Sequence, residues 1–305
     1  EKINSQEIKY IPEHYKKIAL HWLDNIIDWN ISRQIVWGIP IPGDEEHQVF
    51  DTWFSSWQWP FVTLRTSGPK DFKTFYPTDV METGGDLIFF WVSRMLMFSL
   101  YNTKKVPFKN VYMHGLVLDA KGQKMSKSKG NVINPIELIE KFGTDALRMA
   151  LVVGNTPGTS LPLDENKIRG YRNFANKIWN ASRFVMQNTK DYNANKKPTL
   201  NAKQKKHLAQ FNNLAKDVTK SMDNYRFYEA SEKIYHYFWH TFCDKIIEES
   251  KKDMTSATKY MLLEILAGSL KLLHPFMPFI TEEIYQQLPL KNKKKCIMIE
   301  EWITE

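Results

Sequence analysis

The sequence of 305 residues has few cysteines and no long apolar segment. Its two cysteines, Cys243 and Cys296, form no Cys-x-x-Cys pair. This excludes a disulfide framework and favours a reducing, intracellular setting, which we expect to be the cytoplasm. The most apolar stretch, DLIFFWVSRMLMFSL, contains Asp86 and Arg94, so it predicts a buried helix and no membrane partner. No initiator methionine, targeting pattern or internal repeat is present, and the chain looks like a piece of a longer protein.

Charge is the next informative property. The sequence contains 42 Lys and Arg against 34 Asp and Glu, a net charge of +8. This excess is compatible with a polyanionic partner but does not require one, because many basic proteins bind no nucleic acid. The hydrophobic fraction of 43% is enough for a packed core, and the length fits two domains.

The pattern of apolar residues changes near residues 154–166, which are rich in Pro and Gly. Before this joint, β-prone segments alternate with helical ones, as in a parallel α/β sheet. The expected elements are a helix near residues 15–26, a strand over 78–82, a helix from Asp86, a strand over 109–119, and a helix after an N-cap at Asn134 that breaks near Gly143. After the joint, the spacing predicts a bundle of about four or five helices.

The segment KGQKMSKSKGN carries three lysines, Lys124, Lys127 and Lys129, between Gly122 and Gly130. Like charges repel, so such a cluster is best explained by an anion that binds among them. The flanking glycines would let the loop close over that anion. On charge alone, an ordinary solvated basic loop is the alternative.

KMSKS, with HGLVLDAKGQ before it and KGNVINP after it, resembles the second signature of class I aminoacyl-tRNA synthetases. The resemblance implies that this loop contacts the ATP phosphates and stabilises the departing pyrophosphate. Lys124 and Lys127 would then be the catalytic residues. The family often has Leu where Lys129 stands, so we assign Lys129 no catalytic role.

TGGDLIFFW and HGLV resemble the segments of this family that bind adenosine. Taken alone, the first could be a turn with a helix cap at Asp86, and a single histidine is more often structural. With the resemblance, we expect the ATP site to comprise Gly84, Asp86, His114, Gly115, Val117, Lys124 and Lys127.

DTWFSSWQWPF and GGDLIFFWVSRM resemble the valyl branch of the family more than the isoleucyl branch. The resemblance implies that Trp53, Leu87 and Trp91 line a pocket for the valine side chain, with core packing as the ordinary alternative for each tryptophan. Leu87 and Trp91 are four residues apart, so we expect them on one helix face. An apolar slot rejects smaller side chains poorly, because a methylene is worth only about 1–3 kcal/mol.

RNFANKIWNASRFV and HPFMPFITEEIYQQL resemble the anticodon-binding bundle of the same enzymes. The candidate tRNA contacts recur near one polar side of the first predicted helix of this bundle: Arg169, Arg172, Asn173, Lys177 and Asn180. A solvated face is the alternative for such residues. His236 and His240 have a spacing that can bind zinc, but no third ligand is evident, so we predict no metal there.

The predicted fold is therefore α/β plus all-α: the C-terminal half of a Rossmann-like parallel sheet followed by an α-helical bundle. We expect residues 1–30 to resemble the return from the editing insertion, residues 31–160 to form the catalytic half with the KMSKS loop, and residues 161–305 to form the anticodon-binding bundle. The first signature, His-x-Gly-His, the editing insertion and a cysteine-rich zinc insert are not found. We therefore predict an incomplete catalytic domain without structural zinc.

The implied function is the activation of valine with ATP and Mg²⁺ and its transfer to tRNA(Val), by a protein that is monomeric at full length. Two alternatives stay open: a tRNA-binding fragment without catalytic activity, and a synthetase of the isoleucyl or leucyl type.

Overall fold

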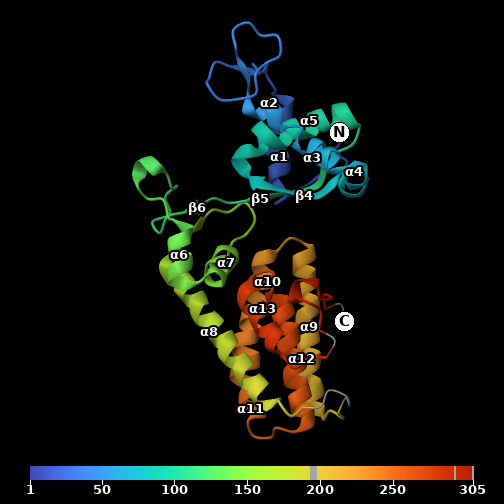
Figure 1. The fold of residues 1–305 in the computed structure, drawn as a ribbon, viewed down its shortest axis with the longest axis vertical. Helices are drawn as coiled ribbons and strands as arrows, with labels where there is room; N and C mark the ends of the chain where they lie inside the picture. Colours follow the sequence, from blue (N-terminus) through green and yellow to red (C-terminus); the bar gives the residue numbers. More distant parts are fainter. Residues whose placement is uncertain (193–197, 292, 304–305) are drawn as a thin grey trace. The chain divides into compact units, whose positions relative to one another are not determined.

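The computed structural model describes residues 1–192, 198–291 and 293–303 (Figure 1). The chain forms two compact units. The first consists of residues 1–116 and 157–160, and the second of residues 117–156 and 161–305. The predicted fold class, an α/β part followed by helices, is confirmed.

A parallel sheet forms the centre of the first unit. Its strands are β1 (Lys9–Ile11), β5 (Phe108–His114) and β4 (Thr78–Gly84), in the order β1-β5-β4. The central strand buries Phe108, Val111 and Met113 almost completely, as expected for a strand with neighbours on both sides. All three strands point the same way, so their carboxyl ends form one edge.

Residues 1–30 are more than the lead-in that the sequence suggests. Strand β1 pairs with β5, and Ile3, Ile8 and Tyr10 are buried in the core of the first unit. Helix α1 (His14–Asp24) adds Ala19 to the same core. The first thirty residues are therefore a structural part of this unit.

Helices of the first unit pack against the sheet and continue its core. The helix expected from Asp86 starts as a 3-10 turn, Gly85–Leu87, widens into a π-helical segment, Ile88–Ser93, and only then becomes α5 (Arg94–Thr103). The remaining elements are β2 (Ser32–Arg33), β3 (Val49–Phe50), α2 (Thr52–Ser56), α3 (Trp59–Ser67) and α4 (Pro69–Phe75). Strands β2 and β3 pair in antiparallel fashion.

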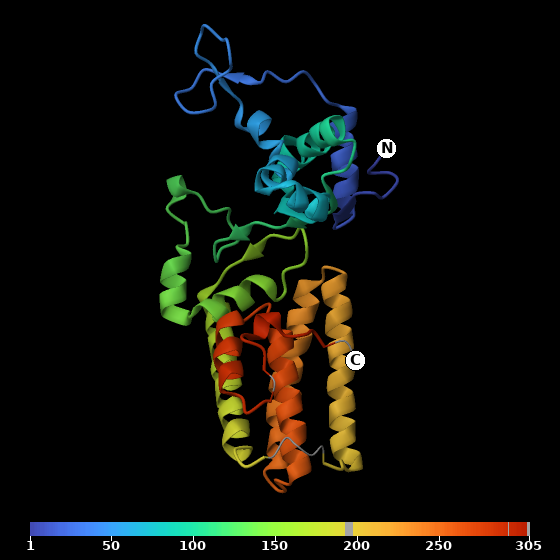
Figure 2. The same cartoon turned by 45° about the vertical axis from the view of Figure 1, so that its right-hand side comes forward.

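Helices dominate the second unit, and the long ones lie side by side in both views (Figures 1 and 2). From residue 165 onward, the helices of this unit are α8 (Glu165–Asn188), α9 (Ala202–Asp223), α10 (Phe227–His236) with its π-helical continuation Tyr237–Ile247, the short α11 (Glu248–Ser250), α12 (Ser256–Leu273) and α13 (Pro278–Gln287). Apolar residues at helical spacing, such as Phe174, Ile178 and Val185 of α8, are fully buried in the shared core.

Two shorter helices and a strand pair connect the lysine loop to this bundle. Strands β6 (Val117–Leu118) and β7 (Leu161–Pro162) are parallel partners. The N-cap at Asn134 is confirmed, because its side chain accepts a hydrogen bond from the amide of Ile136 at 3.0 Å. Helix α6 (Pro135–Phe142) then ends at Gly143, whose φ of +91° separates it from α7 (Thr144–Val152), as predicted.

The compact units divide the chain at other positions than the three segments proposed from sequence. Residues 117–156 belong with the helices, since Leu138, Phe142 and Leu147 share a core with Ile168 of α8. In the part of the chain that the structure describes, no helix combines the length and apolar character needed to cross a membrane.

Candidate active site

The carboxyl edge of the parallel sheet brings four of the predicted ATP-site residues together. Gly84 ends β4 and is the register partner of His114, which ends β5. Gly115 follows His114 directly, and Asp86 lies two residues after Gly84. Ligands of open parallel sheets bind outside the carboxyl ends of the strands, so this edge has the position of a binding site.

Two glycines at this edge are closely covered by neighbouring side chains. A Cβ atom on Gly84 would lie 2.7 Å from the Oδ1 atom of Asp86 and 3.6 Å from Cε1 of His114. A Cβ atom on Gly85 would lie 2.6 Å from the ring of Tyr15, which also faces Gly158. Tyr15, which the sequence analysis missed, therefore forms a wall beside the glycines. Glycine at both positions lets Asp86 and Tyr15 pack directly against the backbone, which any larger residue would prevent.

The side chains of His114 and Asp86 differ in how they are held. The Nδ1 atom of His114 lies 2.8 Å from the carbonyl oxygen of Gly115, and Nε2 lies 3.4 Å from a carboxylate oxygen of Glu82. The carboxylate of Asp86 is exposed and has no hydrogen-bond partner among the described residues. It can therefore accept hydrogen bonds from the hydroxyl groups of a ligand.

The segment 157–160 closes the edge from the other side. The amide of Gly158 donates to the carbonyl of Met113 at 2.7 Å, and the amide of Leu116 donates to Oγ of Ser160 at 3.2 Å. A Cβ atom on Gly115 would lie 2.5 Å from the amide nitrogen of Ser160 and closer still to the carbonyl of Thr159. The two chain segments pass so closely that only glycine fits at position 115.

The predicted amino-acid pocket residues lie on different local structures. Trp53 is on α2, whose N-cap Asp51 accepts a hydrogen bond from the Trp53 amide at 3.1 Å. Leu87 ends the 3-10 turn and Trp91 lies in the π-helical segment that follows it, so the pair does not lie on a regular α-helix. That the two side chains share one face stays a prediction. Their assignment to a valine pocket stays a prediction.

The sequence analysis also did not identify a cluster formed by Trp29, Arg33, Asp51 and Arg94. The guanidinium of Arg94 is buried, 3.4 Å from the ring centroid of Trp29, and burial lowers its pKa while the charge of Asp51 opposes this. Asp51 itself accepts hydrogen bonds from Arg33 at 2.6 Å and from the indole of Trp29 at 2.8 Å. Asp51 therefore ties α2 to the Trp29 segment. In the sequence, this cluster is indicated only by Arg94, a charged residue inside the most apolar stretch.

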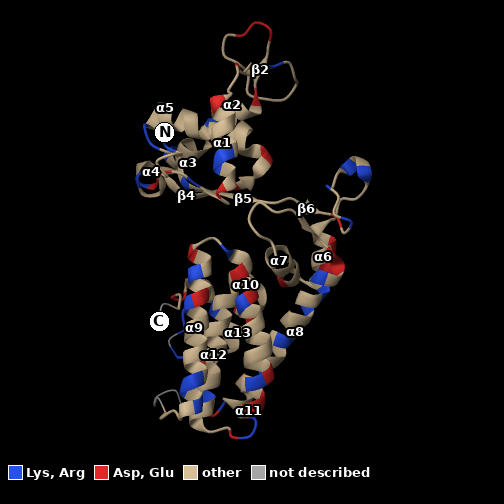
Figure 3. Ribbon diagram, turned by 180° about the vertical axis from the view of Figure 1, so that it is seen from behind, with Lys and Arg blue, Asp and Glu red and all other residues tan. Residues whose placement is uncertain are grey.

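The lysine loop belongs to the second unit, with Val117 in β6 at its start. Lys124, Lys127 and Lys129 are exposed, and none forms an ion pair within the residues that the structure describes. Figure 3 shows the blue basic residues gathered on this loop between β6 and α6. Three unpaired ammonium groups on one short loop create a local positive potential that favours an anion.

The predicted tRNA contacts on α8 are partly engaged within the protein. Lys177 donates to Asp244 at 2.8 Å and lies 5.3 Å from the ring centroid of Trp239. Its hydrogen bond with Asp244 raises the pKa of Lys177. Arg172 donates to the carbonyl of Lys141 at 3.3 Å, and Arg169 to the side chain of Asn166 at 3.2 Å. Asn173 and Asn180 are exposed.

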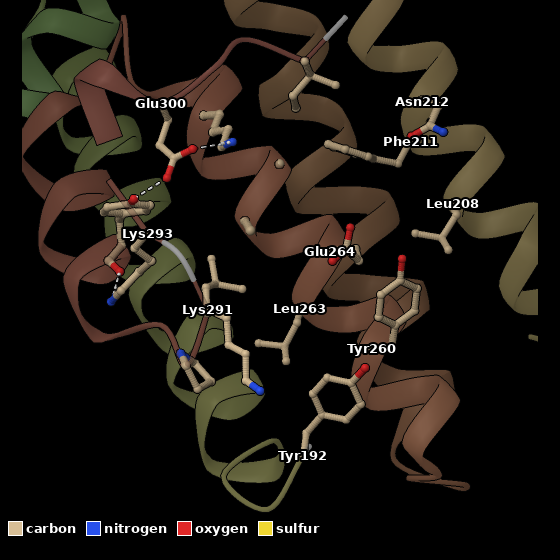
Figure 4. Close-up of a pocket in the computed structure, with 17 residues that line it drawn as sticks. Tyr192, Leu208, Phe211, Asn212, Tyr260, Leu263, Glu264, Lys291, Lys293 and Glu300 are labelled. Carbon is tan, nitrogen blue, oxygen red and sulfur yellow. Dashed lines mark hydrogen bonds and ion pairs between the residues drawn. The ribbon is translucent and has the colours of Figure 1, made fainter. Parts of the chain in front are cut away.

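The helical unit also contains a cavity of about 660 Å³ beside α9 and α12 (Figure 4). Leu208 and Phe211 of α9 point toward α12, which contributes Tyr260 and Leu263. None of the site residues predicted from sequence lines this cavity.

The two histidines with zinc-like spacing have another partner. His240 Nδ1 lies 3.3 Å from Asp244, and the ring of His236 stacks on that of His240. Among the residues described, no group of three or more His, Cys, Asp or Glu side chains is placed to hold a metal ion.

A family model described as tRNA synthetases class I (I, L, M and V) matches residues 1–43 and 44–164. The chain belongs to the class I tRNA synthetases. A second model, the anticodon-binding domain of tRNA ligase, matches residues 204–305 of the chain. The family resemblance expected from KMSKS and its neighbours is confirmed.

Curated relatives of this chain include valine–tRNA ligases. The enzyme of Clostridium tetani is 41% identical over 341 aligned positions, which cover 99% of this chain and 38% of the relative. That of Carboxydothermus hydrogenoformans is 44% identical, covering 97% of this chain and 38% of the relative. The chain thus spans less than half the length of the curated relatives it matches.

Solved synthetases support the fold. Methionyl-tRNA synthetase of Mycobacterium tuberculosis, in complex with methionyl-adenylate, aligns with a TM-score of 0.78 at 21% identity, over 92% of this chain and 59% of that one. A leucyl-tRNA synthetase of Agrobacterium radiobacter, in a ternary complex with tRNA and LeuAMS, aligns with a TM-score of 0.70 at 20% identity, over 89% of this chain and 35% of that one.

Proposed function

We propose that this chain is the part of a valyl-tRNA synthetase that helps to activate valine with ATP and to load it onto tRNA(Val). The observation that carries the proposal is the lysine loop, with three exposed and unpaired ammonium groups directly after a strand. The valine–tRNA ligases that align over nearly the whole chain support the choice of amino acid.

In the first step, a carboxylate oxygen of valine attacks the α-phosphorus of ATP. A bond forms to give valyl-adenylate, and the bond to the β-phosphate breaks to release pyrophosphate. The step needs no protein nucleophile, so positioning and charge stabilisation supply the rate enhancement. Lys124 and Lys127 would neutralise the charge that develops on pyrophosphate. One such contact is typically worth about 3 kcal/mol.

The sheet edge would hold the adenosine. Asp86, exposed at this edge, would accept hydrogen bonds from the ribose hydroxyls, and the strand ends at Gly84 and Gly115 would lie beside the nucleotide. His114 would lie beside the base or ribose, and Val117 would follow at the start of the loop. We expect Mg²⁺ to arrive with ATP as part of the substrate.

The other roles follow the same proposal. Trp53, Leu87 and Trp91 would line the valine pocket. The polar residues of α8, namely Arg169, Arg172, Asn173 and Lys177, would contact tRNA phosphates, together with Asn180. We expect the full-length protein to be a monomer that works in the cytoplasm.

The test is amino-acid-dependent exchange of pyrophosphate into ATP by the full-length protein that carries this chain. Valine should support exchange, and isoleucine and leucine should support much less. Lys127→Ala should lower the exchange rate by about 100-fold, the equivalent of one lost transition-state contact. Lys129→Ala is the matched control and should change the rate by less than about threefold. Equal losses in both variants would contradict the assigned role of Lys127.

A further inference from the structure

Two side chains that the proposed mechanism does not use close the lysine loop at its base. Asp119 follows β6, and Asn131 lies between the lysines and α6. The amide nitrogen Nδ2 of Asn131 donates a hydrogen bond to Oδ2 of Asp119 at 2.8 Å. This bond joins the two ends of the segment that contains all three lysines. We refer to the pair as the Asp119–Asn131 clasp.

Asp119 organises the first half of the loop. Its Oδ1 atom accepts hydrogen bonds from the amides of Lys121 at 3.0 Å and Gln123 at 2.8 Å. Its backbone adds two more bonds, because the Asp119 amide donates to the carbonyl of Gln123 and the Asp119 carbonyl accepts from Gly122. The hydrogen bond from Asn131, followed by that from the Gln123 amide, keeps the pKa of Asp119 below its usual range. Asp119 therefore stays ionised near neutral pH.

Asn131 organises the second half. Its Oδ1 atom accepts from the amide of Ser126 at 3.0 Å, and its Nδ2 atom also donates to the carbonyl of Lys124 at 3.3 Å. Asn131 thus fixes the backbone on both sides of Met125, and Lys127 begins a 3-10 turn directly after Ser126. The clasp sets where the lysine stems start, while their ammonium groups stay exposed.

We propose that Asp119 and Asn131 are positioning residues, which hold the backbone of Lys124 and Lys127 in the geometry that stabilises the departing pyrophosphate. The inference rests on the proposed function, because the anion is the pyrophosphate of that reaction. Neither residue needs to touch the substrate. The clasp acts through the backbone, so its contribution is lost when the Asp119–Asn131 bond is broken, even with all lysines present.

Charge and position predict opposite effects for Asp119, and this makes the inference testable. A carboxylate near an anion site weakens anion binding, so Asp119→Asn should raise activity if charge alone matters. If the clasp matters, the same change should lower activity, because the single oxygen of an amide cannot serve both the amides of Lys121 and Gln123 and the donor of Asn131. Asn131→Asp should also lower activity, since two carboxylates would then face each other.

The double variant Asp119→Asn with Asn131→Asp restores the bond with its polarity reversed. An amide at position 119 can donate to a carboxylate at position 131, which can still accept from the amide of Ser126. The longer bond to the carbonyl of Lys124 is lost, because a carboxylate cannot donate, so we expect recovery that is large but incomplete. We expect each single variant to lower kcat for valine-dependent pyrophosphate exchange by about tenfold, as for the loss of one charge-assisted hydrogen bond. The double variant should recover to within about threefold of the unchanged protein, with the KM for valine nearly constant in all variants.

The control and the second readout separate the clasp from the proposed function. Asp217→Asn, an exposed position on α9, makes the same charge change and should leave the rate unaltered. Hydrogen exchange of the loop amides, that of Ser126 above all, should speed up in both single variants and slow again in the double variant. If the unchanged protein catalyses no exchange with valine, the proposed function fails, while amide protection still reports on the clasp. A gain of activity in Asp119→Asn, or no rescue in the double variant, would overturn the inference.

Discussion

Replacing Gly115 by alanine tests the close passage of two chain segments at the sheet edge. The new Cβ atom would sit 2.5 Å from the amide nitrogen of Ser160, whereas ordinary contacts begin near 3.4 Å. The neighbouring atoms are backbone, so no side chain can rotate away. The carbonyl of Thr159 lies closer still, so segment 157–160 would have to move by more than about 1 Å, and overpacking of this kind typically costs about 1–3 kcal/mol. Because the obstacle is backbone, we expect a cost of about 3 kcal/mol in the free energy of unfolding.

The assay is urea unfolding of the full-length protein that carries this chain, followed by circular dichroism and by tryptophan fluorescence. Gly170→Ala provides the matched control, because a Cβ atom on Gly170 meets nothing within 4 Å and the residue lies inside α8. That control should stabilise the protein by about 0.5–1 kcal/mol, since alanine is the better helix former. The same chemical change should thus have opposite signs at the two sites. Equal effects at both positions would refute the close-approach argument.

Three further predictions concern charge and capping. Asp51→Asn removes an ionic acceptor from Arg33 and the Trp29 indole and should lower the free energy of unfolding by about 2 kcal/mol. Glu300→Gln should be most destabilising near neutral pH. Burial raises the pKa of Glu300, but hydrogen bonds from Tyr285, the Lys294 amide and the Lys271 side chain outweigh burial and lower the pKa from 4.5 to about 2. The ionised carboxylate therefore stabilises the folded state fully above about pH 4.5, and this contribution is lost as pH falls through about 2. Urea unfolding measured at a series of pH values from about 7 to about 2 can follow the loss. Asn201→Ala removes the capping box of α9 and should cost about 1 kcal/mol by urea unfolding.

Each of these has its own check. Asp51→Glu keeps the charge but moves it, so a loss as large as that of Asp51→Asn would show that position matters as much as charge. A pH-independent difference between the unchanged protein and Glu300→Gln would contradict the ionic contribution. For the cap of α9, Asn201→Ser should retain most of the stability, because serine is also a good N-cap.

Local signals in the sequence were enough for several elements. The Asn-Pro pair predicts the start of α6, and Gly143 predicts its end, because both act within one helical turn. The long helices of the second unit follow from apolar spacing in the same way. Strand β1 escaped notice because its partner β5 lies about a hundred residues away, and three residues carry almost no periodic signal.

The segment after Asp86 shows a different limit. Its residues are apolar almost throughout, so the spacing cannot distinguish an α-helix from the wider π-helical turns that the structure contains. The residues of the candidate site show a comparable limit of sequence-based prediction. KMSKS and TGGD are recognisable in the sequence itself, whereas Tyr15 matters only through Gly85 and Gly158, which are distant in the chain. Asp119 and Asn131 are twelve residues apart, and their pairing is visible only once the loop has closed.

The interleaved order of the two units has a consequence for synthesis and for protein engineering. The chain passes between the units after residues 116, 156 and 160. As the chain leaves the ribosome, the first unit can be completed only after residues 157–160 have emerged, so its last piece arrives once helices α6 and α7 have already been made. A cut after residue 160 would strip α8 of the partners with which it shares a core, and a cut after residue 116 would leave the sheet edge open. No single cleavage point separates these units, and a two-piece version would need Gly115 and Ser160 to meet again after synthesis.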